Sequence, residues 1–265
     1  MIVDSHCHLD MIAEREDLDS VVDRARQAGV GTMLTISTKL SNLDRIKGIA
    51  EHYADVWCAV GVHPHEASSE GQTEPDAVVA AAQHPRVVAI GESGLDYHYN
   101  FATKQDQRRS FRAHIRAAQQ TGLPLVVHAR EADDETAEIL RDEYNLGGPF
   151  GCVMHCFSSG RELAMAALDL GFHISFSGIV TFKKSQDLRD IAKEVPADKL
   201  LIETDAPYLA PQPKRGKPNE PSYVRYTCEH LAETLGTSPD DLARRTSDNF
   251  FALFDRAERP AATAA

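Results

Sequence analysis

Eight short apolar runs, rich in β-branched residues, alternate along the chain with segments of helical character. The runs read MIVDSH, GTMLTIS, VWCAVGV, RVVAIGE, LPLVVHA, GCVMHCF, FHISFSG and KLLIETD, and the helical segments include residues 18–28, 105–121, 131–144 and 162–170. Strands that are apolar almost throughout are buried on both faces, as in a parallel sheet, and their alternation with helices indicates βαβ units. Eight such units in about 250 residues favour the α/β class and a single (β/α)8 TIM-like barrel. We expect one domain over residues 1–256 and a disordered tail over residues 257–265.

The alternative architecture is an open, doubly wound sheet. The first run is not followed by a Gly-x-Gly-x-x-Gly sequence, so a dinucleotide-binding version of that sheet is not expected, and neither is an organic cofactor. No stretch approaches the roughly 20 consecutive apolar residues of a membrane span, and the N-terminus lacks the basic and apolar regions of a secretory signal. The five cysteines are odd in number and form no Cys-x-x-Cys pair, which suits a reducing compartment. The expectation is a monomeric, cytoplasmic protein.

The charge balance limits how the chain can meet nucleic acid. The formal net charge is −12, from 28 lysines and arginines against 40 aspartates and glutamates. Tight binding of a duplex normally needs many contacts between basic side chains and phosphates, and an acidic surface repels them. Any nucleic-acid role must therefore depend on a local site or on bound cations.

Imidazoles and carboxylates stand at the ends of the expected strands. In a barrel of this class the active site lies at the C-terminal ends of the strands. Because side chains alternate faces along a strand, the two histidines of DSHCHLD point the same way, and the same spacing aligns the two acids of ETD. The residues at the strand ends are His6, His8, His63, Glu92, His128, His155, Glu203 and Asp205.

Each of these residues alone has a structural explanation, such as a cap on backbone groups. Together they would place many acids and imidazoles at one end of a barrel, where a divalent cation is the simplest means of neutralising them. Imidazole and carboxylate ligands suit zinc, manganese or, with water, magnesium. Six candidate ligands are enough for two cations ~3.5–4 Å apart that share a carboxylate, and Glu92 is the natural bridge. The predicted metal ligands are His6, His8, Glu92, His128, His155 and Asp205.

The blocks that contain these residues resemble the TatD family of metal-dependent deoxyribonucleases. The resemblance rests on IVDSHCHLD, PLVVHAREADDE and VPADKLLIETDAP, with GVHPH, IGESGLDYH and MHCFSSG between them in the family's order. It implies a TIM-like barrel that hydrolyses phosphodiester bonds in DNA. By position, His6, His8, Glu92 and Asp205 would hold one metal, and Glu92, His128 and His155 the second. Related barrels of the phosphotriesterase and dihydroorotase type bridge their metals with a carboxylated lysine on strand 4, where this chain has Glu92.

The predicted mechanism uses a hydroxide that bridges the two metals. The cations would lower the pKa of a bound water and stabilise charge on the phosphate oxygens. Asp205 would be both a metal ligand and the general base. Glu92 would be catalytic as the carboxylate that bridges the two metals. Glu203 would support a ligand imidazole by accepting its hydrogen bond.

Substrate contacts are expected from five side chains. Arg130 lies two residues after His128 and would bind phosphate, unless it forms a rim salt bridge with Glu131 or Asp133. His63 would donate to a phosphate oxygen or to the leaving group, with a structural cap as the alternative. The loop PQPKRGKPNEP carries Lys214, Arg215 and Lys217, which would meet phosphate or remain solvated.

These features leave three functions open. The first is a deoxyribonuclease acting on short or single-stranded DNA or from an end. The second is a two-metal hydrolase of ester or amide bonds, such as acyl or aminoacyl linkages, because the same hydroxide can attack a carbonyl carbon. The third is a metal-binding adaptor without turnover; no protein partner is identified by the sequence.

Overall fold

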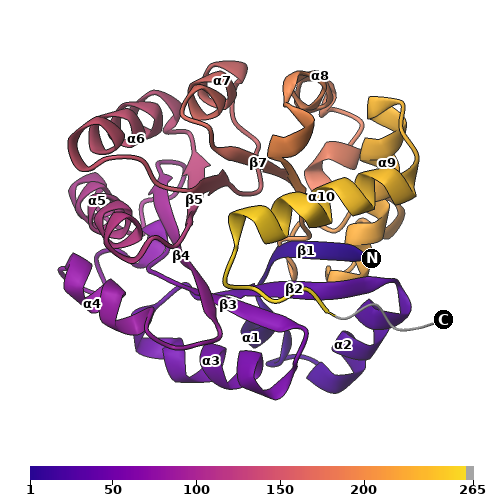
Figure 1. Cartoon of the computed structure of the whole chain (residues 1–265), viewed down its shortest axis with the longest axis horizontal. Coiled ribbons are helices and arrows are strands. Elements are labelled where there is room, and N and C mark those ends of the chain that lie inside the picture. Colours follow the sequence, from indigo (N-terminus) through magenta and orange to yellow (C-terminus); the bar gives the residue numbers. More distant parts are fainter. Residues whose placement is uncertain (261–265) are drawn as a thin grey trace.

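The structure, a computed structural model, describes residues 1–260 and contains one sheet of eight parallel strands. The strands pair in chain order from β1 to β8 (Figure 1). Their bounds are β1 Ile2–Cys7, β2 Val30–Ile36, β3 Val56–Val60, β4 Val87–Asp96, β5 Leu125–Arg130, β6 Cys152–Met154, β7 His173–Phe176 and β8 Leu200–Ile202. The expected (β/α)8 barrel is confirmed. The strands β6 and β8 are shorter than the apolar runs that predict them.

The barrel closes where the chain following β8 meets β1. The backbone N–H of Asp205 donates to the carbonyl oxygen of His6 at 2.9 Å. The buried carboxylate of Asp4 accepts from the backbone N–H of Thr204 at 2.8 Å and from its hydroxyl at 2.6 Å. These bonds hold the first histidine of DSHCHLD beside Asp205, although about 200 residues separate them.

Helices follow the strands and form a ring around the barrel (Figure 1). Their bounds are α1 Leu9–Ile12, α2 Leu18–Gln27, α3 Leu43–His52, α4 Pro75–Ala81, α5 Lys104–Thr121, α6 Asp133–Gly147, α7 Arg161–Asp169, α8 Gln186–Glu194, α9 Val224–Leu235 and α10 Pro239–Leu253. Short 3-10 turns occupy Leu40–Asn42, Pro64–Glu66, Gly178–Thr181, Ala197–Lys199, Gln212–Lys214 and Pro221–Tyr223. The four helices predicted by residue range correspond to α2, α5, α6 and α7.

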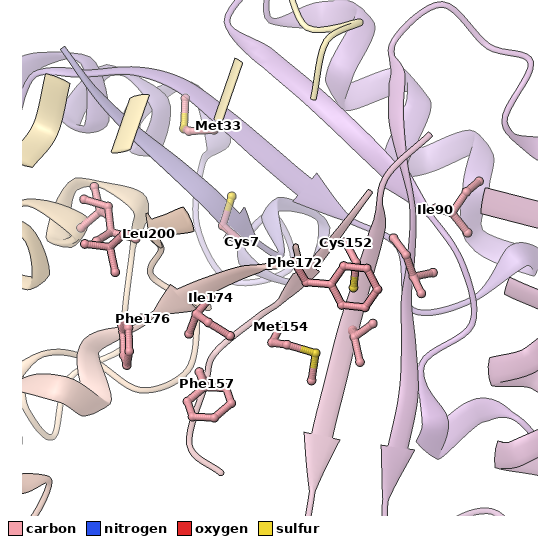
Figure 2. Packing of buried hydrophobic residues seen from close by; sticks show 14 of the residues in the cluster. Cys7, Met33, Ile90, Cys152, Met154, Phe157, Phe172, Ile174, Phe176 and Leu200 are labelled. Carbon is pink, nitrogen blue, oxygen red and sulfur yellow. The ribbon is translucent and has the colours of Figure 1, made fainter. Parts of the chain in front are cut away.

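Apolar side chains pack in an outer layer between the strands and the helices. Met154, Phe157 and Ile174 belong to this layer and are almost fully buried (Figure 2). Cys7 also lies in it, as expected for a side chain that points opposite to its two histidine neighbours. The outer layer therefore fixes the orientation of the strands that end in polar residues.

A second apolar cluster lies on the opposite face of the strands, inside the barrel. It joins strand residues such as Trp57 to Phe250 and Phe254 near the end of the chain. The helix α10 crosses the barrel beside β1 in Figure 1, and Asn249 of α10 donates to the carbonyl oxygen of Leu200 at 2.9 Å. One end of the barrel is thus closed by apolar packing, which leaves the other end for polar groups.

The predicted boundary at residue 256 stays a prediction. Ala257 is buried against the inner cluster, and residues 261–265 of the predicted tail lie outside the described residues. Among residues 1–260, no helix has the length and apolar character needed to cross a membrane.

Candidate metal centre

The polar residues predicted from the strand ends converge at the C-terminal end of the barrel. His6 lies in β1 and His8 just after it, Glu92 lies in β4 and His128 in β5. The remaining residues follow their strands: His63 follows β3, His155 follows β6, and Glu203 and Asp205 follow β8. Five of these side chains, His6, His8, His63, His128 and His155, lie within 4 Å of the Glu92 carboxylate, and Asp205 and Glu203 each contact an imidazole of this set.

Glu92 is the centre of the cluster, and its Oε1 atom faces three imidazoles. The Nε2 atom of His155 lies 2.7 Å from it, Nδ1 of His128 lies 3.1 Å away, and Nε2 of His63 lies 3.5 Å away. The side chain of Glu92 is almost fully buried. A carboxylate in such a place must be balanced by protons on the imidazoles or by a cation.

The second oxygen of Glu92 faces the histidines of β1. Its Oε2 atom lies 3.5 Å from Nε2 of His6 and 3.9 Å from Nε2 of His8. The Oδ1 atom of Asp205 lies 3.6 Å from the same His6 atom and 3.5 Å from the same His8 atom. The two oxygens of one carboxylate therefore face two different sets of potential ligands.

The charges of the cluster keep Glu92 ionised. Burial alone would raise the pKa of Glu92, but the imidazoles of His155 and His63 and the hydrogen bonds from His128 and His155 lower this pKa well below its usual range. Burial would also lower the pKa of His155, yet Glu92 and Glu203 raise it well above its usual range. Without metal, the carboxylates thus retain protons on nearby imidazoles. A divalent cation would replace those protons when it binds.

The residues present fit a divalent cation. Glu92 Oε2 is buried and has no hydrogen-bond partner among the described residues, and the Nε2 atoms of His6 and His8 face each other at 3.4 Å. Imidazole and carboxylate donors suit zinc and manganese. Three groups have ligand atoms close enough to share an ion: His6, His8 and Asp205; His63, Glu92 and His128; and His6, His155 and Glu203.

This grouping differs from the predicted ligand sets at His63 and at His155. His63 joins Glu92 and His128, whereas the sequence analysis treated His63 as a substrate contact. His155 is grouped with His6, onto whose ring it stacks with centroids 3.9 Å apart. His155 nevertheless makes the shortest contact to Glu92, so its predicted place beside His128 is compatible with the geometry. The ligand sets stay a prediction.

Asp96 is a buried member of the site that the sequence analysis missed. The strand β4 continues past Glu92 to Asp96, whose Oδ2 atom lies 3.0 Å from Nε2 of His128 and 2.9 Å from Nε2 of His65. Because the other ring nitrogen of His128 faces Glu92, Asp96 fixes the orientation of this imidazole. Gly94 permits the strand to continue, since its φ is +144° and a Cβ there would lie 2.0 Å from the carbonyl oxygen of His128. The even spacing from Glu92 to Asp96 was the available signal.

The two acids after β8 contact different parts of the cluster. The Oε1 atom of Glu203 lies 3.2 Å from Nδ1 of His155, the contact expected of a supporting carboxylate. Asp205 instead approaches His6 and His8. Both acids reach the cluster as expected from their spacing, but not through a regular strand, because β8 ends at Ile202 and Asp205 has a positive φ of 57°.

His63 lines the cleft and also shapes the loop after β3. Its Nδ1 atom accepts from the backbone N–H of His65 at 3.1 Å, which is the capping contact considered as an alternative. Its Nε2 atom remains directed at Glu92. On the preceding residue, the backbone N–H of Val62 donates to Nε2 of buried His114 at 3.0 Å. Burial lowers the pKa of His114 to about 4.

A cleft of about 780 Å³ opens over the cluster. Arg130 is the one lysine or arginine among the described residues that line it. Its Cζ atom lies 5.0 Å from the ring centroid of Tyr99. Within residues 1–260 Arg130 forms no salt bridge with Glu131 or Asp133, the predicted alternative. Its guanidinium is therefore not neutralised by these carboxylates, which suits phosphate binding.

The basic loop after β8 is not part of the cleft lining. Lys214 Nζ lies 5.1 Å from the ring centroid of Tyr223, and Arg215 Cζ lies 3.8 Å from that of Phe182. Neither residue lines the cleft, and Lys217 does not line it either. Their predicted contact with substrate stays a prediction.

Comparison with known proteins agrees with this geometry. The sequence model of a family described as "TatD related DNase" matches residues 3–255. An uncharacterized metal-dependent hydrolase of Escherichia coli K12, YcfH, is 43% identical over 96% of this chain and 95% of its own length. The 3'-5' ssDNA/RNA exonuclease TatD of Salmonella typhimurium is 38% identical over 91% of this chain and 94% of its own length.

A solved structure shows the same architecture. The TatD homologue YJJV of Escherichia coli K12 superposes with a TM-score of 0.89 at 28% identity, and the match covers 96% of this chain and 98% of that one. The resemblance seen in the sequence is therefore confirmed, and so is the class of enzyme, a metal-dependent hydrolase of ester bonds. The chain belongs to the TatD-related DNase family.

Proposed function

We propose that this protein hydrolyses phosphodiester bonds of DNA with the help of two divalent cations. The observation that supports two cations is the position of Glu92, whose two carboxylate oxygens face separate sets of imidazoles. His6, His8, Glu92 and Asp205 would hold one cation, and Glu92, His128 and His155 the other. Zinc, manganese and magnesium are the candidates, in that order for sites rich in imidazole. When bound, the cations would supply a more acidic water and positive charge for the phosphate.

Asp205 is the residue proposed to orient the attacking water and accept its proton. Its side chain lines the cleft. Burial would raise its pKa, but the hydrogen bond from His8 and the imidazoles of His6 and His155 lower it. Asp205 is thus ionised near neutral pH, as a hydrogen-bond acceptor for water must be.

His63 and Arg130 are proposed to hold the substrate phosphate. Burial lowers the pKa of His63 well below its usual range, so its imidazole is neutral. Because Nδ1 accepts from the N–H of His65, the proton of the neutral ring is on Nε2, which is the atom at the cleft. That N–H can donate to a phosphate oxygen or to the leaving group. The guanidinium of Arg130 adds a planar pair of donors.

The preferred substrate is proposed to be short or single-stranded DNA, or DNA entered from an end. One relative is named as an exonuclease of single-stranded DNA and RNA. The cleft has a single arginine and the chain a net charge of −12, too little positive charge for an extended duplex contact. A cytoplasmic location is part of this proposal, and the five cysteines, none of which forms a disulfide, suit a reducing compartment.

The test is an assay of metal-reconstituted protein on end-labelled single- and double-stranded DNA, beside simple ester and amide substrates. We expect cleavage of DNA, fastest on single strands, and loss of cleavage in Glu92→Ala and Asp205→Asn. Leu146→Ala is a matched control, because Leu146 is exposed on α6 and does not line the cleft. Turnover of esters or amides without DNA cleavage would favour an acyl hydrolase. No turnover of any substrate by metal-loaded protein would favour the adaptor.

A further inference from the structure

Exposed aromatic side chains collect at the mouth of the cleft. Among the described residues, five large apolar side chains are substantially exposed, and three of these line the cleft: Tyr99, Phe101 and Tyr208. The other two, Met1 and Leu146, do not line it. Exposed apolar groups that gather at one place mark a binding surface more often than scattered ones do. The mouth of the cleft is thus built to meet a flat or apolar part of a ligand.

Two of these aromatic rings form a stacked pair. The ring centroids of Tyr99 and Phe101 lie 5.3 Å apart, and their planes differ by 25°. Phe101 is 66% exposed, which leaves much of its ring open to solvent. Arg130 lies over the Tyr99 ring. The same short segment thus offers an aromatic surface next to the one guanidinium of the cleft.

The aromatic pair is tied to the metal centre through one carboxylate. The backbone N–H of Tyr99 donates to Oδ1 of Asp96 at 3.2 Å. His65 meets both rings edge-on, with centroids 5.4 Å from Tyr99 and 4.9 Å from Phe101, and its Nε2 atom lies 2.9 Å from Oδ2 of Asp96. Asp96 also holds His128. The rings therefore occupy a defined position relative to His128, a candidate metal ligand.

Tyr208 lies next to a different part of the ligand cluster. Its ring centroid lies 6.2 Å from that of His8, whereas Tyr99 and Phe101 are next to His65. Aromatic side chains thus lie next to two separate parts of the site, one at His8 and one at His65. A phosphodiester lies between two nucleosides, each with a planar base.

We propose that Tyr99 and Phe101 form a stacking platform for an unpaired nucleobase beside the reacting phosphate, with Tyr208 placed for the base on its other side. The platform, defined as Tyr99 and Phe101, would make the enzyme select single-stranded nucleic acid. This inference rests on the proposed function. In a duplex each base has both faces covered by its neighbours, whereas an unpaired base can stack on protein rings whatever its identity. With one arginine in the cleft, base stacking would add affinity that basic side chains do not supply.

The kinetic test compares wild type with the double variant Tyr99→Ala and Phe101→Ala on a labelled single-stranded oligonucleotide. Loss of base stacking should reduce kcat/KM about 10- to 100-fold, mainly through KM. On a strand whose terminal nucleotides lack bases, wild type should show the same loss, and the double variant should lose little more. The exchanged aromatic pair Tyr99→Phe and Phe101→Tyr should keep the wild-type KM. Leu146→Ala should also match wild type, since this exposed side chain does not line the cleft.

A binding test gives a readout that does not depend on turnover. Strands with 2-aminopurine at either end and phosphorothioate linkages are titrated with metal-loaded protein, because stacking on an aromatic ring quenches the fluorescence of this base. Wild type should quench one of the two strands, and the alanine double variant should not. Equal KM and equal quenching in wild type and double variant would overturn the platform while leaving nuclease activity in place. If wild type neither binds these strands nor cuts the unmodified oligonucleotide of the kinetic test, the proposed function itself fails.

Discussion

The two halves of the candidate metal centre are supported in different ways. In the half formed by β4, β5 and β6, each imidazole uses its second nitrogen to contact a carboxylate: His128 contacts Asp96 at 3.0 Å and His155 contacts Glu203 at 3.2 Å. In the half formed by β1 and the chain after β8, the Nδ1 atoms of His6 and His8 are buried and have no hydrogen-bond partner among the described residues. We call these the supported half and the unsupported half.

The different support of the two halves indicates which half is ordered before a cation binds. A carboxylate behind a ligand imidazole fixes its rotation and tautomer and makes it a better donor. The imidazoles of the supported half are already ordered in the folded protein, so less conformational entropy is lost when a cation binds there. The unsupported half depends on the closure of the barrel between His6 and Asp205 for its geometry. We therefore expect the supported half to retain its cation longer during titration with a chelator.

The largest effect is expected for Glu92→Ala, which removes the group that the two halves share. Both cations should bind weakly, and DNA cleavage should fall at least ~1,000-fold, the scale expected when a central catalytic group is lost. Glu143→Gln is a matched control, because Glu143 of α6 is equally buried but lies outside the cluster. It pairs there with Arg112 and Arg116 of α5. Metal content and cleavage rate are measured together. Wild-type metal content in Glu92→Ala would remove the basis for a shared ligand.

The next largest effect is expected on the pH dependence of the free energy of unfolding, through His114. This buried imidazole accepts from the backbone N–H of Val62, the residue before His63. The pKa of His114 is lowered to about 4 in the folded chain, below the ~6.5 of an unfolded histidine, so the unfolded state binds more protons between these values. Stability should therefore be complete above pH ~6.5 and fall as the pH decreases toward 4, by up to about 3 kcal/mol from this residue.

Urea unfolding of metal-free protein between pH 4 and pH 7 measures this loss. The variant His114→Gln should show a shallower pH dependence than wild type, because Gln does not titrate. His52→Gln, a change at a largely exposed histidine, should keep the wild-type dependence. Parallel curves for wild type and His114→Gln would show that the buried imidazole does not contribute.

A smaller effect is expected when only the supported half is weakened. Asp96→Asn places an amide N–H₂ group where the N–H groups of His128 and His65 now find an acceptor. The affinity for the cation of the supported half should fall about 10- to 100-fold, the usual consequence of losing such a carboxylate. The unsupported half should be unaffected. Competition with a chelator, followed by spectrometry of the released metal, separates the two affinities; equal weakening of both would erase the distinction between the halves.

Much of the site could be predicted because it follows from strand periodicity. The even spacing in DSHCHLD and the position of Glu92 at a strand end were enough to place their side chains in one cluster. The apolar pattern of β4 ends at Glu92 and therefore does not indicate Asp96. In the structure Gly94 allows β4 to continue beside β5 as far as Asp96. Asp205 reaches the cluster through a backbone with positive φ, which no alternation rule describes.

The aromatic residues at the cleft mouth could not be predicted in this way. Tyr99 and Phe101 lie in a loop after β4, where no periodicity indicates which side chains are exposed. Their stacked arrangement depends on contacts with His65 and Asp96 that come from other parts of the fold. The basic loop near Lys214, which the sequence made prominent, lies outside the cleft lining.

Metal stoichiometry tests the central claim of two halves joined by one glutamate most directly. Elemental analysis of purified, reconstituted protein should find two divalent ions per chain in wild type. The variant His6→Ala with His8→Ala should keep one ion, held by the supported half, and the variant His128→Ala with His155→Ala should keep one, held by the unsupported half. Two ions in the His6 and His8 variant, or none, would contradict the division of the site described here.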